Sequence, residues 1–372
     1  MKVLFIITTL DVGGAEKVLL DMLRYSVNRG VEARVFCLSA PGVLVADIMK
    51  LGIGVECFNL RAQPWNLRLF WRMRAAGRRW QPEVVHAWMY HACFAATILH
   101  SWWGRPRLLW SIHNTHVGRR DLGLATMMLT RVLALLSGRP QGIAYVSQAA
   151  QRVHEKLGYR PDKSHWLPNG FDTGRFKPGP DGAGTGLRAE LGLSDLVPVV
   201  GLVSRDGPQK NIDDFFRAAT LLAQERPDVH FVCCGMGLDA ANRRLQPWLA
   251  GLQGRLHLLG VRRDMPRLYA ALTVLLLPSS GESLPNVIGE AMSCGVPCVC
   301  TDTGDCAALV GPGGIIVQPL QPAALARACL RLLALPVAER EALGRAARAH
   351  IMAQYPLEKS LGSTLALLRQ RD

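Results

Sequence analysis

A chain of 372 residues is too long for one ordinary hydrophobic core, and its length predicts two domains. With 49% hydrophobic residues, 19% charged residues and no low-complexity run, the composition excludes a disordered or fibrous chain. The formal net charge of +14 lies almost wholly in the first half, because residues 1–177 hold 24 Lys and Arg against 11 Asp and Glu, a net of +13.

Apolar runs typical of buried strands alternate with helical patterns in the first half. The opening run, residues 2–9, is interpreted as a strand and not as a signal peptide, because DVGGAEKV follows where a small-residue cleavage site would be expected. A helix is predicted from about Glu16 to Arg29. Further strands are predicted at 33–39, 83–88, 107–113 and 142–147. This alternation indicates a parallel, doubly wound sheet.

The pattern restarts after a loose segment at 178–187, PGPDGAGTGL, the one place where disorder is expected. Strands are predicted at 198–204, 228–235, 255–260, 273–278 and 296–301. We expect an α/β protein with domains at 1–180 and 188–355, a final helix at 356–372, and a ligand cleft at the carboxyl ends of the strands. No stretch reaches the roughly 18 uncharged apolar residues of a membrane span, since Arg131 interrupts residues 122–137.

Neither the ten cysteines nor the histidines predict a metal site. Cys294, Cys298 and Cys300 are close in sequence but lack paired CxxC spacing, so they are interpreted as core residues of a protein in a reducing compartment. The motif HNTH, from His113 to His116, resembles a two-histidine metal pair but has no third acidic ligand nearby.

Basic residues and tryptophans are concentrated together in the first half, in RLFWRMRAAGRRW, GRPR and GRR. This combination suits an anionic membrane surface, while nucleic acid is the competing electrostatic interpretation and a solvated surface the neutral one. The tryptophans concerned are Trp65, Trp71, Trp80, Trp102, Trp103 and Trp110.

Two glycine motifs follow predicted strands, but neither is a dinucleotide fingerprint. Gly13 and Gly14 lie between the first strand and the first helix, and GMG at 235–237 follows a later strand. Both lack the third glycine at the required interval, so a nicotinamide enzyme is poorly supported.

Charged side chains gather in two loops of the second half. Arg205 and Lys210, in GLVSRDGPQKN, are spaced to reach one polyanion. In GESLPNVIGEAMSCGVP, a helix is predicted from Pro285 to Cys294, and its first turn exposes backbone amides that suit an anion. Glu282 and Glu290 could flank such a phosphate, or they could be unrelated glutamates of a capped surface helix.

Two histidines of the first half, His86 in VVHAW and His113 in WSIHNTH, are each predicted to follow a strand. A histidine at the carboxyl end of a strand would point into the cleft, whereas a satisfied core histidine is the alternative.

Taken in order, the motifs resemble the family 4 retaining glycosyltransferases of the GT-B fold. The resemblance rests on GGAE at 13–16, VVHAW at 84–88, PNGFD at 168–172, SRDGPQK at 204–210, and ESLPNVIGEAM followed by GVP. It implies two Rossmann-like doubly wound domains facing across a cleft, with an acceptor bound by the first domain and a nucleotide sugar by the second. It also implies that the final helix crosses back to the first domain.

The resemblance assigns roles to these residues. Arg205 and Lys210 would hold the diphosphate with the segment after Glu282, Glu290 would bind the ribose, and Glu282 would bind the donor sugar. His113 would contact the reacting sugar, so the expected catalytic residues are His113, Glu282, Arg205 and Lys210. The remaining donor-side residues are Ser283, Leu284, Pro285, Asn286, Gly235 and Val261, and the acceptor-side residues are Gly13, Gly14, His86 and Asn169.

The expected function is transfer of a sugar from a nucleoside diphosphate sugar to a lipid-linked saccharide. UDP is the expected nucleotide because it is the commoner one, and no metal cofactor is expected. WMYHA at 88–92 resembles a subgroup associated with bacterial surface polysaccharides, which implies a cytoplasmic protein at the inner membrane face. Ala308 stands where the family often has glutamate, and Ser204 where it often has glycine. A same-fold epimerase or phosphorylase, and a catalytically silent nucleotide-sugar binder, are the alternatives.

Overall fold

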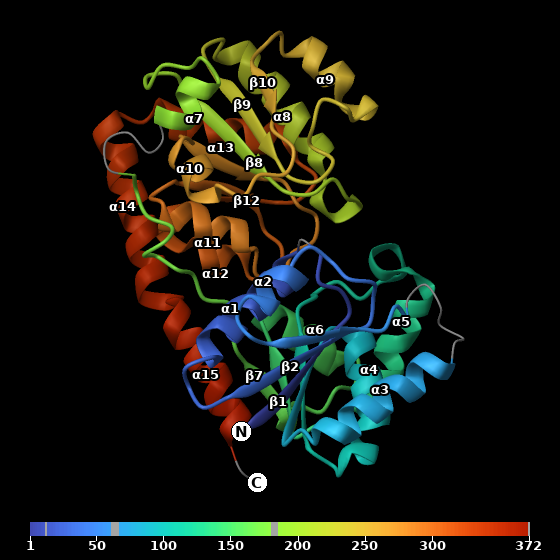
Figure 1. The fold of residues 1–372 in the computed structure, drawn as a ribbon. Helices are drawn as coiled ribbons and strands as arrows, with labels where there is room; N and C mark the ends of the chain where they lie inside the picture. Colours follow the sequence, from blue (N-terminus) through green and yellow to red (C-terminus); the bar gives the residue numbers. More distant parts are fainter. Residues whose placement is uncertain (12, 61–66, 180–184, 371–372) are drawn as a thin grey trace. The chain divides into compact units, whose positions relative to one another are not determined.

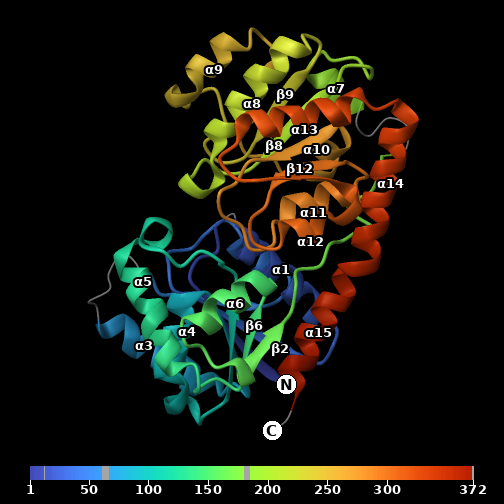
Figure 2. The ribbon, with the colours of Figure 1, turned by 180° about the vertical axis from the view of Figure 1, so that it is seen from behind.

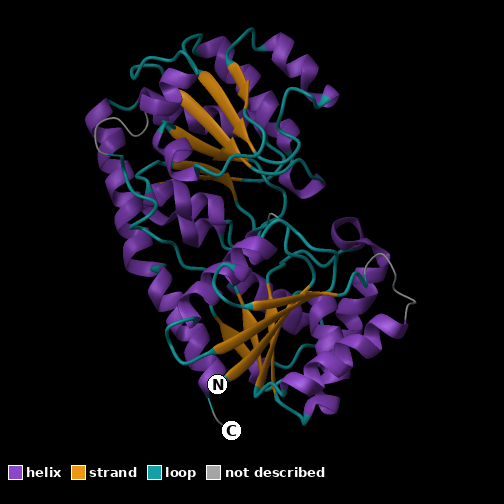
Figure 3. Cartoon of the chain, viewed as in Figure 1, coloured by secondary structure: helices purple, strands orange, loops and turns teal. Residues whose placement is uncertain are grey.

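The computed structural model describes residues 1–11, 13–60, 67–179 and 185–370, and it divides the chain into two compact units (Figure 1). The first unit comprises Met1–Asn169 and Glu358–Asp372, and the second comprises Gly170–Leu357. In each unit a parallel sheet is covered by helices (Figure 3), so the predicted pair of doubly wound α/β domains is confirmed.

The sheet of the first unit has the strand order β3-β2-β1-β4-β5-β6-β7. The order reverses between β1 and β4, and such a switch point is where open α/β sheets bind ligands. The strands are β1 (Lys2–Ile7), β2 (Glu32–Cys37), β3 (Gly54–Cys57), β4 (Val84–Trp88), β5 (Arg107–Ile112), β6 (Gly142–Tyr145) and β7 (Ser164–Trp166). The helices are α1 (Gly14–Ser26), α2 (Val45–Met49), α3 (Leu67–Trp80), α4 (Tyr90–Leu99), η1 (His100–Trp103), α5 (Arg119–Leu136), α6 (Gln148–Lys156), η2 (Pro161–Lys163) and α15 (Leu357–Arg369).

Two layers of helices enclose this first sheet. Side chains of α3, α4, α5 and α6 form one core with one face of the sheet, around large buried residues such as Trp110 and Tyr145. Side chains of α1 and α15 face β4, β5 and β6 on the other side. Helix α15 is fixed there by hydrogen bonds from Arg107 Nη1 to the Leu367 carbonyl, at 2.6 Å, and from Ser360 Oγ to the Pro168 carbonyl, at 2.6 Å.

The sheet of the second unit has the order β10-β9-β8-β11-β12-β13, with its switch point between β8 and β11. Helix α13 packs with α8 against this sheet, as Figure 2 shows from behind. The strands are β8 (Val199–Val203), β9 (His230–Cys234), β10 (Leu256–Leu258), β11 (Val274–Leu277), β12 (Cys298–Thr301) and β13 (Gly314–Val317). The helices are α7 (Thr185–Glu190), η3 (Pro208–Lys210), α8 (Ile212–Glu225), η4 (Arg243–Leu245), α9 (Gln246–Gly251), α10 (Met265–Ala270), α11 (Asn286–Ser293), α12 (Cys306–Val310), η5 (Gly311–Gly313), α13 (Pro322–Ala334) and α14 (Val337–Gln354).

The first unit ends earlier than the expected boundary at residue 180. Phe171 and Phe176 are both buried in the core of the second unit, and the Phe171 N–H donates to the Tyr355 carbonyl at 2.9 Å. The chain has therefore entered the second unit by residue 170. Of the loose segment at 178–187, residues 180–184 lie outside the described part of the chain, and α7 begins at Thr185.

The ten cysteines all have free thiols, and Cys298 and Cys300 are buried on β12 as expected for core residues. In the described ranges, no group of three or more His, Cys, Asp or Glu side chains is arranged to hold a metal ion. No helix within those ranges has the length and apolar character needed to cross a bilayer.

Candidate active site

The switch point of the second sheet brings together the two charged loops singled out in the sequence. One loop follows β8 and the other follows β11, and these strands are neighbours in the sheet. The loops are joined by hydrogen bonds from the Ser280 N–H to the Gln209 carbonyl, at 2.8 Å, and from Asn211 Nδ2 to the Pro278 carbonyl, at 3.3 Å. Their relative position is therefore fixed by the backbone of the second unit.

Lys210 and Glu282 form an ion pair where these loops meet. Lys210 Nζ lies 2.6 Å from Glu282 Oε1, and Ser279 Oγ donates to the same oxygen at 2.7 Å. The Glu282 side chain is only 8% exposed and that of Lys210 is 23% exposed, so the pair is largely shielded from water. Because both bonds use Oε1, Oε2 of Glu282 is available to a ligand hydroxyl.

Gly235 allows the loops after β8, β9 and β10 to approach one another. Its φ of +140° and its position are compatible only with glycine, because a Cβ there would overlap the Ser204 carbonyl oxygen. The Gly235 N–H donates to the Gly260 carbonyl at 2.8 Å, which places the exposed Val261 next along this edge. Ser204, where the family often has glycine, is accommodated in this arrangement.

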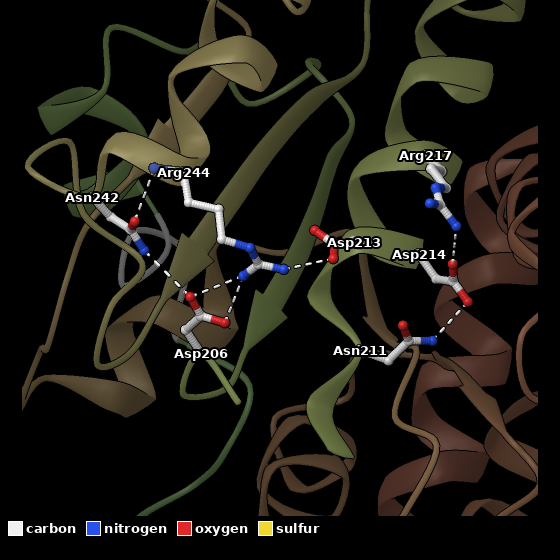
Figure 4. Close-up of polar contacts among 7 residues, drawn as sticks. All are labelled: Asp206, Asn211, Asp213, Asp214, Arg217, Asn242 and Arg244. Carbon is white, nitrogen blue, oxygen red and sulfur yellow. Dashed lines mark hydrogen bonds and ion pairs between the residues drawn. The ribbon is translucent and has the colours of Figure 1, made fainter. Parts of the chain in front are cut away.

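Arg205 lies on a loop held by a polar network that the sequence did not reveal (Figure 4). Arg244 Nη1 donates to both carboxylate oxygens of Asp206, at 2.8 and 3.0 Å, and Arg244 Nη2 donates to Asp213 at 2.5 Å. Asn242 Nδ2 donates to Asp206 at 3.3 Å. Arg205 itself is exposed. The network thus fixes the backbone beside Arg205 and leaves its side chain toward solvent.

The helix after Glu282 is one residue shorter than predicted at each end, with Pro285 and Cys294 as its caps. Pro285 is the N-cap, with an extended ψ of 114°, and the helix starts at Asn286. At its end Gly295 has a φ of +75°, and the Val296 N–H donates to the Ala291 carbonyl at 3.0 Å. This is the Schellman arrangement that favours glycine.

Both glutamates of the motif are buried, so α11 is not a plain surface helix. Glu290 is 5% exposed and accepts a hydrogen bond from the Tyr269 hydroxyl at 2.8 Å. Burial and the neighbouring Glu290 carboxylate raise the pKa of Tyr269 well above its usual value, so this hydroxyl stays a donor. The next residue, Ser283, is fixed because its carbonyl accepts a hydrogen bond from the Asp305 N–H at 2.9 Å. Leu284 is buried.

In the first unit, three predicted residues line one cavity between the sheet and helices α1 and α15. These residues are His86, His113 and Asn169, and Trp88 and Ser111 lie among them. Ser111 Oγ and His113 Nε2 are 3.1 Å apart, and the His113 ring stacks on Trp88 with 4.8 Å between centroids. His113 is therefore held in one orientation.

His86 does not follow a strand, contrary to the prediction. Strand β4 continues to Trp88, which pairs in register with Ser111 and Ile7, so His86 lies inside the sheet. It is 1% exposed, and in the described structure neither of its ring nitrogens has a hydrogen-bond partner. Burial lowers the pKa of both His86 and His113 to about 3, so both rings are neutral at pH 7.

The two glycines lie at the start of α1. Gly13 is the N-cap and Gly14 the first helical residue. A Cβ at Gly13 would overlap the Glu16 carboxylate, so the missing side chain lets Glu16 fold back over the helix N-terminus. At the other departure from the family pattern, Ala308 contributes only its carbonyl, which lies 3.1 Å from His350 Nε2.

The chain is similar to known glycosyltransferases in sequence and in fold. The model described as Glycosyltransferase Family 4 matches residues 12–175, and the model described as Glycosyl transferases group 1 matches residues 197–335. The structure of HepE from Anabaena in complex with UDP-glucose is similar, with a TM-score of 0.85 and 25% identity over 99% of this chain and 100% of that chain.

Two curated relatives are similar over most of their length. The GDP-mannose-dependent monoacylated alpha-(1-6)-phosphatidylinositol monomannoside mannosyltransferase of Corynebacterium glutamicum is 28% identical over 282 residues, covering 72% of this chain and 71% of that protein. The D-inositol 3-phosphate glycosyltransferase of Geodermatophilus obscurus is 27% identical over 395 residues, covering 96% and 84%. The two family matches fall on the two units in turn, and the chain belongs to the family 4 glycosyltransferases of the GT-B fold.

Proposed function

We propose that this enzyme transfers a sugar, with retention of configuration, from a nucleoside diphosphate sugar to a saccharide acceptor. The Lys210–Glu282 pair at the switch point is the observation that carries the proposal. It joins a cation suited to a diphosphate to a carboxylate suited to sugar hydroxyls. UDP is the proposed nucleotide, supported by the HepE complex, which was solved with UDP-glucose.

Departure of the nucleoside diphosphate builds negative charge on its phosphates, and fixed positive groups lower the energy of that step. Lys210 Nζ has three donors, of which Glu282 uses one, so the others are available to the diphosphate. The exposed side chain of Arg205 and the positive end of the α11 helix dipole add to this charge. We therefore propose that the reaction needs no metal cofactor.

The remaining roles follow from hydrogen-bonding capacity. Glu290, oriented by Tyr269, is the proposed acceptor for the ribose hydroxyls, and Glu282 Oε2 for a hydroxyl of the donor sugar. Neutral His113 would act on the reacting sugar as a hydrogen-bond partner and not as a charge. The proposed displacement occurs on one face of the sugar, so mass spectrometry should detect no glycosyl-enzyme adduct.

The proposed acceptor is a lipid-linked saccharide of a bacterial surface polysaccharide, met at the cytoplasmic face of the membrane. The +13 charge of the first half supports this proposal. The name of the Corynebacterium relative adds support, since it describes an acceptor built on phosphatidylinositol. A same-fold epimerase or a silent binder would bind the nucleotide sugar and yield no transfer product.

The first test is thermal stabilisation by UDP, GDP, ADP and CMP. A ligand at 100 times its Kd adds about 2.7 kcal/mol to stability, enough to shift the Tm by several degrees. We expect one nucleoside diphosphate to stabilise the native protein and Glu225→Ala, whose substituted residue is exposed on α8, but not Glu290→Ala. If no nucleotide stabilises the folded native protein, the proposed function is wrong.

A further inference from the structure

We propose that the exposed side chains of α3, η1 and α5 form a surface that docks on an anionic lipid bilayer. This surface is called the α3–α5 surface below. The inference rests on the proposed function in one respect, since a lipid-linked acceptor is the reason for the enzyme to meet a membrane. Charge, aromatic geometry and exposed apolar side chains support the surface itself.

The segment of the chain that contains these elements is strongly basic. Residues 57–154 contain 13 arginines, no lysine, and two acidic residues, Glu83 and Asp121. Helix α3 alone carries five arginines and no acidic residue. Arg78 and Arg79 are both exposed at its end. Such a field attracts an anionic surface over roughly a Debye length.

Of the tryptophans expected at an interface, two are exposed among those that the structure describes. Trp71 on α3 and Trp102 on η1 are 53% and 38% exposed, and their rings lie parallel with centroids 6.0 Å apart. The Arg74 guanidinium lies 4.8 and 4.7 Å from the two centroids. Trp80, Trp103 and Trp110 are buried, and Trp65 lies outside the described residues. Trp71, Trp102 and Arg74 thus form a solvent-facing group of the kind found at membrane–water boundaries.

Helix α5 adds an apolar stripe that is exposed in the described part of the chain. Leu124, Met128, Val132 and Leu135 recur at intervals of four, four and three residues, so they share one side of the helix. They are 54%, 52%, 40% and 88% exposed. The opposite side of α5 is buried in the core through residues such as Leu133. A continuous exposed stripe of this kind indicates a binding surface.

These elements belong to one layer of the first unit. Helices α3, α4 and α5 lie side by side in both views, and η1 directly follows α4 (Figures 1 and 2). The aliphatic stripe distinguishes a bilayer from nucleic acid. Arginines and tryptophans suit either partner. Leu135, the most exposed side chain of the stripe, is stabilised only by transfer to an apolar environment.

The test is vesicle flotation of the full-length protein at low salt, with phosphatidylcholine vesicles and with vesicles that also contain phosphatidylglycerol. We expect binding only to the anionic vesicles, and a loss of about tenfold in binding for Arg78→Ala/Arg79→Ala. Arg327→Ala/Arg331→Ala removes the same charge from exposed positions of α13 and should bind normally. Equal losses in the two double variants would overturn the proposal.

A second pair of variants tests the apolar part. Leu135→Ser should weaken vesicle binding, whereas Leu196→Ser, at an equally exposed site of the second unit, should not. Failure of the native protein to bind anionic vesicles would overturn the proposal, as would tight binding to a single-stranded oligonucleotide with none to vesicles.

Nucleotide stabilisation measured on the same samples separates this inference from the proposed function. The four variants should keep the thermal transition and the nucleotide response of the native protein. If the native protein responds to nucleotide but does not bind vesicles, the proposed docking surface is wrong and the proposed function stands. If the native protein binds vesicles but responds to no nucleotide, the proposed function is wrong and the proposed docking surface stands.

Discussion

The Lys210–Glu282 pair shows how much a single residue's role depends on its neighbours. Spacing in the sequence predicted that both residues belong to the site, and the structure joins them at 2.6 Å. Their supporting partners could not be predicted, because Ser279 and Tyr269 have no special spacing from the glutamates that they contact. The prediction that His86 follows a strand was wrong because the strand predicted at 83–88 itself contains His86, and β4 does end at Trp88.

Glu282→Gln tests the assignment of this carboxylate to the sugar. The amide keeps the shape of the side chain but removes the charge, so we expect kcat to fall by about 10²-fold. Affinity for the free nucleoside diphosphate should be unchanged, because that part of the donor is assigned to other residues. Steady-state kinetics and nucleotide titration measure the two effects, with Glu225→Gln as the control. Equal losses of kcat and nucleotide affinity would contradict the assignment.

Tyr269→Phe tests whether this buried hydroxyl orients Glu290. Loss of a hydrogen bond to a charged group should lower the free energy of unfolding by about 1.5–3 kcal/mol, which urea denaturation measures. The preference for UDP over 2′-deoxy-UDP should narrow, because Glu290 would be held less firmly toward the ribose. Tyr25→Phe is the matched control, since Tyr25 carries Arg29 over its ring and the change leaves that ring in place. An unchanged preference in a destabilised variant would make Tyr269 purely structural.

At the scale of elements, central strands were predicted well and edge strands poorly. The missed strands are β3, β7 and β13, and each lies at an edge of its sheet. They have three or four residues of mostly intermediate exposure, so their apolar runs are too short to stand out. Both ends of the helix after Glu282 were predicted to within one residue, because Pro285 and Gly295 mark its start and its end.

The network around Asp206 holds the loop that carries Arg205, so a substitution in this network should affect donor binding without a direct contact to the donor. Arg244→Ala would release Asp206 and Asp213 together, so the backbone beside Arg205 would lose its anchor. We expect the donor KM to rise by about tenfold with a smaller change in kcat, because a bidentate charge-assisted pair is lost.

Arg226→Ala is the control for this prediction. Arg226 makes a similar bidentate pair with Asp228, at 2.9 and 2.7 Å, after the end of α8. If both variants raise the donor KM equally, the network has no specific role in positioning Arg205.

At the scale of the whole molecule, acid should destabilise the first unit through its buried histidines. Burial lowers the pKa of His86 and His113 to about 3 and that of His154 to about 4, and all three lie in the first unit. The unfolded chain binds protons near pH 6.5, so it binds more protons than the native state below that pH. The stability of the first unit is therefore complete above about pH 6.5 and falls as the pH drops toward 4, by up to about 1.4 kcal/mol per pH unit for each histidine.

Tryptophan fluorescence can follow this effect, because eight of the nine tryptophans lie in the first unit. Urea denaturation at pH 7, 6 and 5 should give a falling midpoint. His86→Leu replaces an unpartnered ring by an apolar side chain, so its midpoint should depend less on pH. A pH dependence identical to that of the native protein would rule out a contribution from His86.

The chain leaves the first unit after Asn169 and returns to it at Glu358, so the whole second unit is one uninterrupted insertion. Its two ends meet, since Phe171 is bridged to Pro356 and the Leu357 N–H donates to the Phe171 carbonyl at 3.2 Å. A graft of the corresponding segment from a relative would therefore need only two joints, both beside this bridge. Chimeras of this kind would exchange the unit to which we assign the donor while leaving the first unit, with its own carboxyl-terminal helix, covalently intact.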